Sequence, residues 1–313
     1  IDGGADIILI ETIFDVLNAK AAIYAARQVF AERGIHLPIM ISGTITDASG
    51  RLLSGQTTDA FWASVRHAKP LSVGFNCALG AEELRPYVEQ ISRISDSYIS
   101  AYPNRGLPNE FGEYDETIEH MTSAVQEYAE SGLVNMVGGC CGTTPEHMRS
   151  VVERVGGRAI SPRTPVPEAS AASLYQSVPF RQDTTYLSIG ERTNANGSKA
   201  FREAMLEERW DDCLEIARAQ ISDGAHLLDL CIDYVGRDGV ADMRELAGRL
   251  ATASTLPIVL DSTEPAVLQA GLEQLGGRAL INSVNYEDGD GPESRLRRIM
   301  PMVTEHGAGV VAL

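Results

Sequence analysis

The chain has 313 residues, of which 44% are hydrophobic, so it can bury the core of one large barrel or of two ordinary domains. Its formal net charge of −17 argues against a nucleic acid or an anionic membrane surface as partner, because like charges repel. No apolar run approaches the roughly 20 residues of a membrane-spanning helix, and five irregularly spaced cysteines favour a reducing cytoplasm over a secreted disulfide framework.

Short apolar runs alternate with helix-length amphipathic stretches, which is typical of parallel βα units. The chain lacks an initiator Met and opens directly on an apolar strand, so we expect a piece of a longer protein. Helices are predicted, for example, at Ala81 to Ser95 and Thr117 to Ser131. The strands predicted in this first block are Ala5 to Thr12, Pro38 to Ile45, Ser72 to Cys77, Tyr98 to Tyr102 and Leu133 to Val137.

A break in the pattern follows at residues 157–183. This segment is rich in Pro, Ser, Ala and Arg and has no periodic apolar pattern, so it is predicted to be a linker between domains. A second block of βα units then occupies residues 184–313. Its predicted strands are Tyr186 to Gly190, His226 to Ile232, Pro257 to Asp261, Ala279 to Ser283 and Gly309 to Leu313.

Each block has five βα units, fewer than the eight that close a barrel. The first block starts on a strand and the second stops on one. We therefore predict an α/β fold with two (β/α)8 TIM-type barrels in tandem, the first (1–156) without its N-terminal strands and the second (184–313) without its C-terminal strands. A doubly wound open sheet is the structural alternative.

Three cysteines follow predicted strands of the first block, Cys77 after one and Cys140 with Cys141 after another. The carboxyl ends of parallel barrel strands share one rim, so these thiols can converge. Catalytic zinc takes three protein ligands and leaves the fourth position open, and a thiol bound there loses its proton easily. The alternative is that the cysteines are small buried apolar residues, which is the better interpretation for Cys213 and Cys231. Residue types alone leave both interpretations open for the first three.

The loops around these cysteines resemble the signature of zinc-dependent homocysteine S-methyltransferases. The resemblance rests on Asn76 to Gly80 and Gly138 to Pro145, and further on Ile39 to Arg51 and Leu107 to Tyr114, so it covers essentially the whole first block. It implies that homocysteine sulfur takes the fourth position on zinc. The zinc ligands that it implies are Cys77, Cys140 and Cys141.

Two further residues are implied by the same resemblance. Glu11 matches an acid that helps to hold the substrate's amino group, although a carboxylate before a helix can also be solvated or act as an N-cap. Asn104 sits where the family offers an amide oxygen to zinc in the absence of substrate, although Asn between Pro and Gly is common in turns. The family's Gly-rich first-strand motif is not in this chain, so we expect the zinc ligands without a complete homocysteine pocket.

In the second block, polar residues follow successive predicted strands. Glu191, Asn194 and Asn196 come after the first, and Asp261 and Asn282 end two later ones. A pterin ring presents N–H donors and a carbonyl acceptor along one edge, which a carboxylate and an amide can bind. Each residue alone could instead cap the following helix.

This block resembles methyltetrahydrofolate-binding modules and, more distantly, the dihydropteroate synthase group of pterin barrels. The resemblance implies a pterin pocket, with the Asn282 amide as a catalytic hydrogen-bond donor near N5 of the folate. Cys231 stands where relatives often have Asn, which puts the contacts of its strand in question. The pocket residues implied are Glu191, Asp229, Asp261 and Asn282.

Together the two resemblances imply methyl transfer from 5-methyltetrahydrofolate through cobalamin to homocysteine, giving methionine and tetrahydrofolate. No histidine lies in an Asp-x-His-x-x-Gly motif, so cobalamin is expected on another domain of the same natural chain. One alternative is a pterin-barrel methyltransferase that acts on a separate corrinoid protein, with the first block unrelated to homocysteine methyltransferases. Another is a non-enzymatic scaffold stabilised by zinc. Zinc content and the Cys77→Ala variant separate these possibilities.

Overall fold

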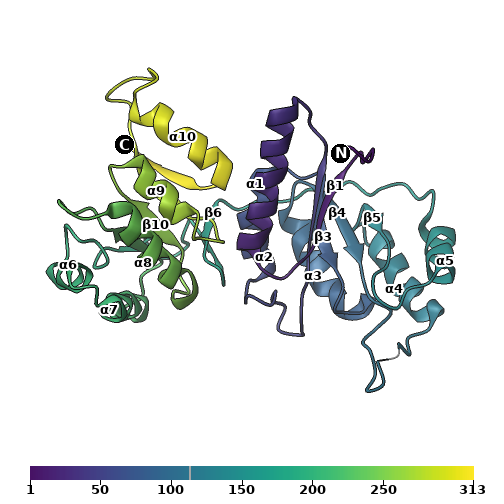
Figure 1. Ribbon diagram of the computed structural model, residues 1–313. Helices are drawn as coiled ribbons and strands as arrows, with labels where there is room; N and C mark the ends of the chain where they lie inside the picture. The colour runs from purple at the N-terminus through teal and green to yellow at the C-terminus, as the bar shows by residue number, and fades with distance from the viewer. Residues whose placement is uncertain (113) are drawn as a thin grey trace. The chain divides into compact units, whose positions relative to one another are not determined.

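The computed structural model describes residues 1–112 and 114–313, so that Glu113 of the Leu107 to Tyr114 motif lies outside the described residues. The chain forms two compact units (Figure 1). The first unit comprises Ile1–Trp62 and Ala68–Glu168, and the second comprises Ala63–His67 and Ala169–Leu313.

The first unit is built on a parallel sheet that has five strands within the described residues, hydrogen-bonded in chain order. The strands are β1 (Ile8–Ile13), β2 (Ile39–Gly43), β3 (Ser72–Asn76), β4 (Tyr98–Tyr102) and β5 (Met136–Val137). The helices that accompany these strands in the chain are α1 (Val16–Arg33), α2 (Thr58–Val65), the 3-10 turn η1 (Arg66–Ala68), α3 (Ala81–Ile94), α4 (Ile118–Glu130) and α5 (Pro145–Val155). Of these, the end of α2 and most of η1 belong to the second unit.

The central strands of this sheet are its most buried part. Every residue of β2 and β3 is buried, as expected for parallel strands covered on both faces. Strands β3 and β4 approach so closely that a Cβ on Gly74 would lie 1.7 Å from the Ser100 carbonyl oxygen. Glycine is therefore required at this position, which lies two residues before the end of β3.

The second unit is built on another parallel sheet, also with five strands among the described residues, in the order β12-β11-β10-β9-β8. The strands are β8 (Ile189–Gly190), β9 (Leu227–Cys231), β10 (Ile258–Asp261), β11 (Leu280–Val284) and β12 (Gly309–Ala312). The helices are α6 (Lys199–Leu206), α7 (Trp210–Ser222), α8 (Gly239–Ala253), α9 (Pro265–Leu272) and α10 (Arg295–His306).

The two faces of this second sheet differ. Leu228, Leu230 and Leu260 point to one face and join the main core together with the helices. Alternate residues point to the other face, where Leu227 and Val259 lie in a smaller cluster with Ala171 and Val178. Farther along the strands, the same alternation places the polar residues of the second block on this less covered face.

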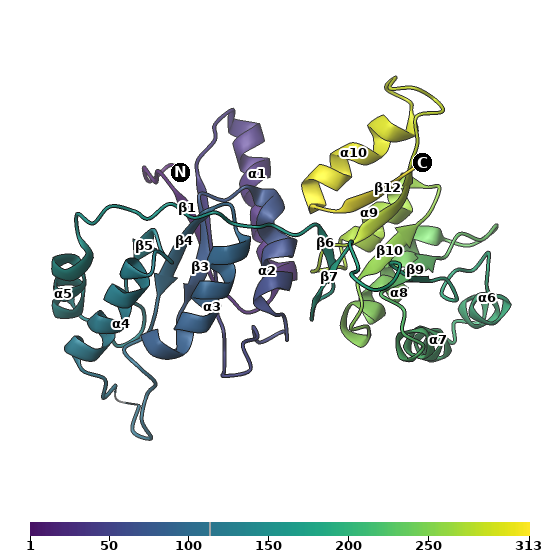
Figure 2. The ribbon, with the colours of Figure 1, turned by 180° about the vertical axis from the view of Figure 1, so that it is seen from behind.

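The segment 157–183, predicted to be a linker, connects the two units and contains a hairpin. Its first part belongs to the first unit, where Arg163 donates hydrogen bonds to the Ser92 and Ser95 carbonyls. Figure 2 shows this part as an extended coil. The rest forms the antiparallel strands β6 (Ser170–Ala172) and β7 (Ser177–Pro179) in the second unit. Strands of three residues are too short to give a periodic apolar pattern.

The predicted α/β class with parallel sheets is confirmed, and each predicted strand of the two blocks corresponds to one of β1 to β5 or β8 to β12. Strands β5 and β8 are shorter than predicted. Within residues 1–112 and 114–313 neither sheet closes on itself. None of the described helices has the length and apolar character needed to cross a membrane.

Candidate functional site

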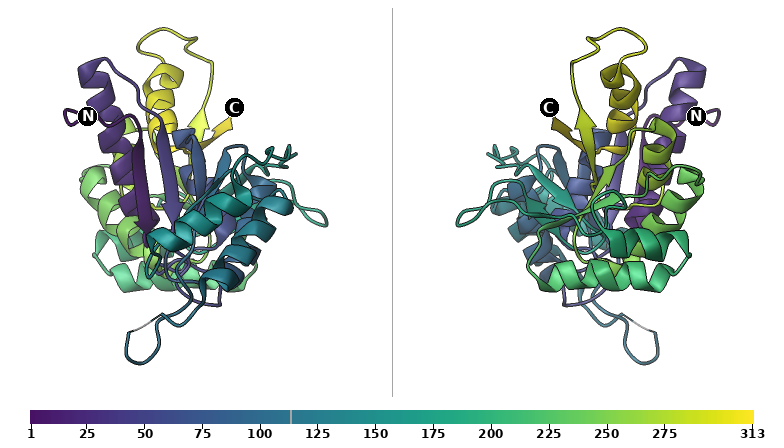
Figure 3. Two further views of the ribbon diagram at one scale, coloured as in Figure 1. Left: turned by 90° about the vertical axis from the view of Figure 1, so that its right-hand side faces the viewer. Right: turned by 90° about the vertical axis from the view of Figure 1, so that its left-hand side faces the viewer.

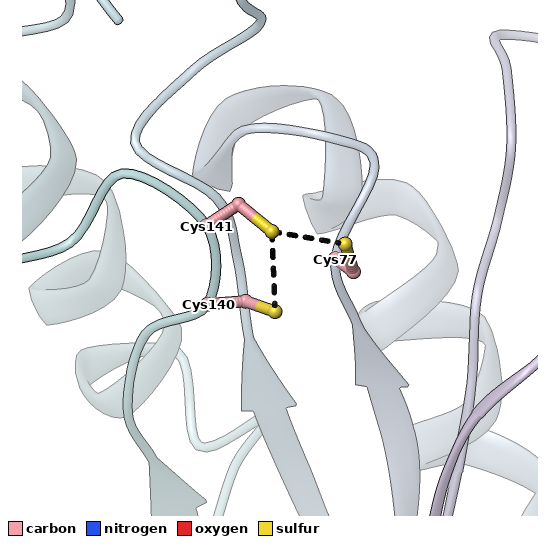
Figure 4. A group of neighbouring side chains, drawn as sticks. All are labelled: Cys77, Cys140 and Cys141. Carbon is pink, nitrogen blue, oxygen red and sulfur yellow. Dashed lines mark hydrogen bonds between the residues drawn. The ribbon is translucent and has the colours of Figure 1, made fainter.

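Three cysteine sulfur atoms meet at one end of the first sheet. Cys77 follows β3, and Cys140 and Cys141 lie in the loop after β5. Their Sγ atoms all lie within 4.8 Å of one another, with 3.6 Å between Cys77 and Cys141 and 4.0 Å between Cys140 and Cys141. Figure 4 shows the three side chains pointing toward one another. Cys77 and Cys140 are half-buried, and Cys141 is exposed.

The backbone around these cysteines is held in an unusual conformation. Cys77 and Ala78 both have positive φ angles, 66° and 58°, which is rare for residues other than glycine and turns the chain sharply after β3. The Cys77 amide donates to the Tyr102 carbonyl, and the Cys140 amide donates to the Pro103 carbonyl. Both cysteine loops are therefore attached to the end of β4.

Asn76, the residue before Cys77, joins three strand ends beneath the cysteines. It is 1% exposed. Its Oδ1 accepts hydrogen bonds from the Thr12 amide at 3.0 Å and the Ser42 hydroxyl at 2.7 Å. Its Nδ2 donates to the Thr12 hydroxyl at 2.8 Å and lies 3.9 Å from the Cys140 sulfur. Its position directly before Cys77 is visible in the sequence, but its contacts with Thr12 and Ser42 are not.

The two other residues implied for the homocysteine site lie near the same sheet end. Asn104 is 3% exposed, and its Oδ1 accepts the Cys141 amide at 3.0 Å. In this structure its amide oxygen thus orients the cysteine loop. Glu11 is exposed near the end of β1. Burial, and to a lesser extent the Glu11 charge, raises the pKa of Tyr102, so Glu11 and Tyr102 lie near each other.

Tyr114 is a further neighbour of the cysteines that the sequence analysis did not single out. It lies in the loop between β4 and α4, which projects from its unit (Figure 3). A Cβ on Gly142 would lie 2.6 Å from the Tyr114 ring, so the ring packs directly on the cysteine loop. Burial and the neighbouring Cys141 raise the pKa of the Tyr114 phenol.

The chemistry of this donor set suits zinc. Burial and the charge of Cys77 raise the pKa of the Cys140 thiol to about 11, so clustered thiolates are unfavourable without a cation. In a tetrahedral zinc site with bonds of about 2.3 Å, neighbouring sulfurs lie about 3.8 Å apart. The distances of 3.6 and 4.0 Å bracket this value. These two distances are therefore compatible with zinc coordination.

A second polar group lies at the carboxyl ends of the strands of the second sheet. Asp261 at the end of β10 is in register with Cys231 on β9 and with Asn282 on β11. Asp229 lies two residues before Cys231 and therefore points to the same face. Glu191 follows β8 and raises the pKa of Asp229 through its charge. The structure thus brings together all four residues implied for a pterin pocket.

Two carboxyl groups in this set share one amide donor. Asn194 Nδ2 donates to Asp229 Oδ2 at 2.8 Å and to Asp261 Oδ2 at 3.2 Å. Burial is the largest cause that raises the pKa of Asp229, to about 6, followed among the raising causes by the charge of Asp261. Burial also raises the pKa of Asp261, and Asn194 lowers both pKa values.

Cys231 and Cys213 are buried, as the sequence indicated, at 2% and 1% exposure. Burial raises the pKa of Cys231 to about 12, so this thiol stays protonated at neutral pH. Asn196 Nδ2 lies 3.5 Å from the Cys231 sulfur. Cys231 is thus a neutral side chain at the end of β9, two residues after Asp229 and opposite Asp261 on β10.

Both halves of the chain match known families. Residues 1–155 match the family model "Homocysteine S-methyltransferase", and residues 190–313 match "Pterin binding enzyme". The first match speaks against the alternative in which the first block is unrelated to homocysteine methyltransferases. It includes all three clustered cysteines, and the second match includes the carboxylates around Asn194.

Curated relatives match along the whole chain. The chain is 52% identical to methionine synthase of Mycobacterium tuberculosis over 317 residues and 50% identical to methionine synthase of Mycobacterium leprae over 322 residues. Each alignment covers 100% of this chain and 26% of the relative, so the chain spans about a quarter of the length of these proteins.

Among solved structures, the apo form of the Escherichia coli homocysteine methyltransferase MmuM matches with a TM-score of 0.37 and 19% identity. That match covers 49% of this chain and 51% of MmuM, and its TM-score is too low to establish a shared fold. The sequence matches are decisive by themselves. The chain is thus related along its whole length to a part of methionine synthase, and within it a segment that matches homocysteine S-methyltransferases is followed by one that matches pterin binding enzymes.

Proposed function

We propose that the chain supplies the homocysteine and folate modules of a cobalamin-dependent methionine synthase. The reaction transfers the methyl group of 5-methyltetrahydrofolate through cobalamin to homocysteine, giving methionine and tetrahydrofolate. The observation that carries the proposal is the meeting of three cysteine sulfurs within 4.8 Å in the segment that matches homocysteine S-methyltransferases. A pterin-binding segment in the same chain supplies the matching donor site. Cobalamin belongs to another domain of the whole protein.

We also propose that each sheet is part of a (β/α)8 barrel, with modules at 1–156 and 184–313 joined by 157–183. Support comes from the parallel strands, from their hydrogen bonding in chain order and from the polar residues at their carboxyl ends, where barrel enzymes hold their chemistry. The free thiols of all the described cysteines suit a reducing compartment, and we propose the cytoplasm.

In the homocysteine module, Cys77, Cys140 and Cys141 would hold zinc. Zinc bound there supplies a Lewis-acid centre with one open position for a substrate thiol. Asn76 and Asn104 orient the ligand loops from beneath through their buried amides. Glu11, exposed at the end of β1, is proposed to bind the ammonium group of the amino acid by charge.

In the folate module, the carboxylates of Asp229 and Asp261 would accept hydrogen bonds from the N–H groups along the pterin edge. Glu191 borders the same face. Asn282, half-buried beside Asp261 on the neighbouring strand, offers an amide donor to N5. N5 is a poor leaving group until it gains a proton or a hydrogen bond, so this donor eases loss of the methyl group.

Metal analysis of purified protein tests the proposal. We expect a stoichiometric amount of zinc in the wild-type chain and in Cys213→Ala, and its loss in Cys77→Ala. After cobalt substitution, homocysteine should change the thiolate-to-metal absorption of the wild type. In Cys77→Ala, metal affinity should fall by more than the roughly 10- to 100-fold that is lost when only a hydrogen-bonding partner of a ligand is removed.

Cys213→Ala is the control, because it also removes one thiol, but from a buried position in α7 that is far along the chain from the cluster. A wild-type chain without zinc and without a response to homocysteine would contradict the proposal. If Cys77→Ala instead unfolded the first unit, the cluster would be a structural zinc site, because a site that serves an existing fold leaves the variant folded.

A further inference from the structure

Asn194 occupies a central place in the second unit that the proposed function leaves unexplained. It is 7% exposed and lies in the loop between β8 and α6. Its side chain reaches two different strands, because Nδ2 donates to Asp229 on β9 and to Asp261 on β10. A single buried amide group therefore lies between the buried Asp229 carboxyl group and the half-buried Asp261 carboxyl group.

The orientation of this amide is fixed from the other side. Asn194 Oδ1 accepts the backbone N–H groups of Asn196 at 2.9 Å and of Gly197 at 3.2 Å. A flipped amide would set its NH₂ group against these two donors and its oxygen against two carboxylates. Only one orientation satisfies all four partners, so the loop after β8 directs the donor at the carboxyl pair.

We propose that Asn194 is a positioning residue of the pterin pocket, whose amide holds the Asp229 and Asp261 carboxylates at the spacing that accepts the N–H donors of a pterin ring. The proposal rests on the proposed folate module and adds a residue to it. Two neighbouring carboxylates repel each other, and a shared donor offsets part of that repulsion. Without it, one carboxyl group would remain protonated or would turn away.

The charged surroundings of the pair set the direction of any change. Burial and the charges of Asp261 and Glu191 all raise the pKa of Asp229. The hydrogen bond from Asn194 lowers this pKa and so opposes them. Asp261 also has a cationic neighbour. The groups that act on Asp261 are Asp233, Asn194, Arg295 and Cys231.

Carboxyl titration without ligand is the first test. The chain is labelled with 13C at aspartate carboxyl carbons, and Asp229→Asn assigns the Asp229 signal. In Asn194→Ala and Asn194→Ser we expect the pKa of Asp229 to rise above its wild-type value, because the amide lowers it. Asn194→Asp should raise it further, because a third carboxylate replaces the donor.

Binding of 5-methyltetrahydrofolate, measured by calorimetry from pH 6 to 8, is the second test. We expect Asn194→Asp to weaken binding about 10- to 100-fold, since a donor to charged groups is lost. For Asn194→Ala the loss of folate affinity should become smaller as the pH rises, because Asp229 and Asp261 ionise at a higher pH in this variant than in the wild type. Thr184→Asp adds the same charge at an exposed position before β8, outside the loop that carries Asn194, and is the matched control.

The outcomes separate the two proposals. If the wild type does not bind the folate, the proposed function fails, and the carboxyl titration still reports on Asn194. If the wild type binds and the Asn194 variants bind equally well with unchanged titration, the positioning role is overturned. Weaker binding with unchanged titration also overturns it, since loss of a merely structural residue would give that result. If Asn194→Asp does not fold, the Ala and Ser variants decide.

Discussion

Asp229 is a carboxyl group placed where its charged form is poorly solvated. Its pKa is raised from 3.8 to about 6, with burial as the largest cause. A carboxyl group whose pKa is higher in the folded than in the unfolded state costs stability once the unfolded chain ionises. That cost begins near pH 3.8, grows to about pH 6 and stays constant above. Stability and the proposed binding of a pterin therefore make opposing demands on this side chain.

Asp229→Asn is accordingly predicted to stabilise the second unit at pH 7 by about 1 to 3 kcal/mol, since it removes the charge and keeps an acceptor for Asn194. Near pH 3.5 the two proteins should be equally stable. Urea unfolding followed by the fluorescence of Trp210, which packs on the core of this unit, measures both values. If the wild type and Asp229→Asn were equally stable at pH 7, the charge of the Asp229 carboxylate would not destabilise the fold.

Residue types and their positions at strand ends predicted which side chains meet. The three cysteines and the residues around Asp261 follow predicted strands, so parallel topology alone brings them to one sheet edge. The roles of Asn76 and Asn194 could not be predicted in this way. Their hydrogen-bond partners lie 34 to 67 residues away along the chain, apart from the local turn after Asn194, and depend on tertiary packing.

At the scale of elements, long apolar strands were predictable and short ones were not. Strands β2 and β3 are buried throughout and give continuous apolar or small-residue runs in the sequence. The hairpin of β6 and β7 has strands of three residues in a Pro-rich and Ser-rich segment, so propensity gave no signal there. Its position is fixed by contacts such as the hydrogen bond from the Ala172 amide to the Arg278 carbonyl.

Gly74→Ala tests the close approach of β3 and β4. The added Cβ would lie 1.7 Å from the Ser100 carbonyl oxygen, so the strands must separate. We expect a loss of about 3 kcal/mol or more, the upper range for overpacking, and loss of metal binding, because Cys77 directly follows β3. Gly3→Ala is the control, since no atom lies within 4 Å of its added Cβ. Equal melting temperatures of the two variants would contradict this interpretation.

At the scale of the whole molecule, two compact units each carry their own polar site. The sequence indicated this division from the break at 157–183, and the contacts change from one unit to the other after Glu168, within that segment. The residue at which the first unit ends depends on side-chain contacts, such as those of Arg163 with the first unit. Composition does not reveal these contacts.

Hydrogen exchange is predicted to respond to each ligand in one unit at a time. Zinc added to metal-free chain should slow amide exchange in the loops around Cys77 and Cys140. 5-Methyltetrahydrofolate should slow it at the ends of β9 to β11. Binding protects the segments that it orders. Cys77→Ala should lose the zinc effect and keep the folate effect, and a folate effect confined to the first unit would contradict the assignment of the second site.

The order of strands in both sheets has a consequence for biosynthesis. Among the described residues, each strand of β2 to β5 and of β9 to β12 pairs with the strand that precedes it in the chain. A newly translated strand therefore finds its partner already made, and each βα unit can dock as it leaves the ribosome. Contacts close along the chain favour rapid folding, and domains generally fold as units during synthesis, the N-terminal one first. The cysteine site can thus assemble before the strands of the second unit have been translated.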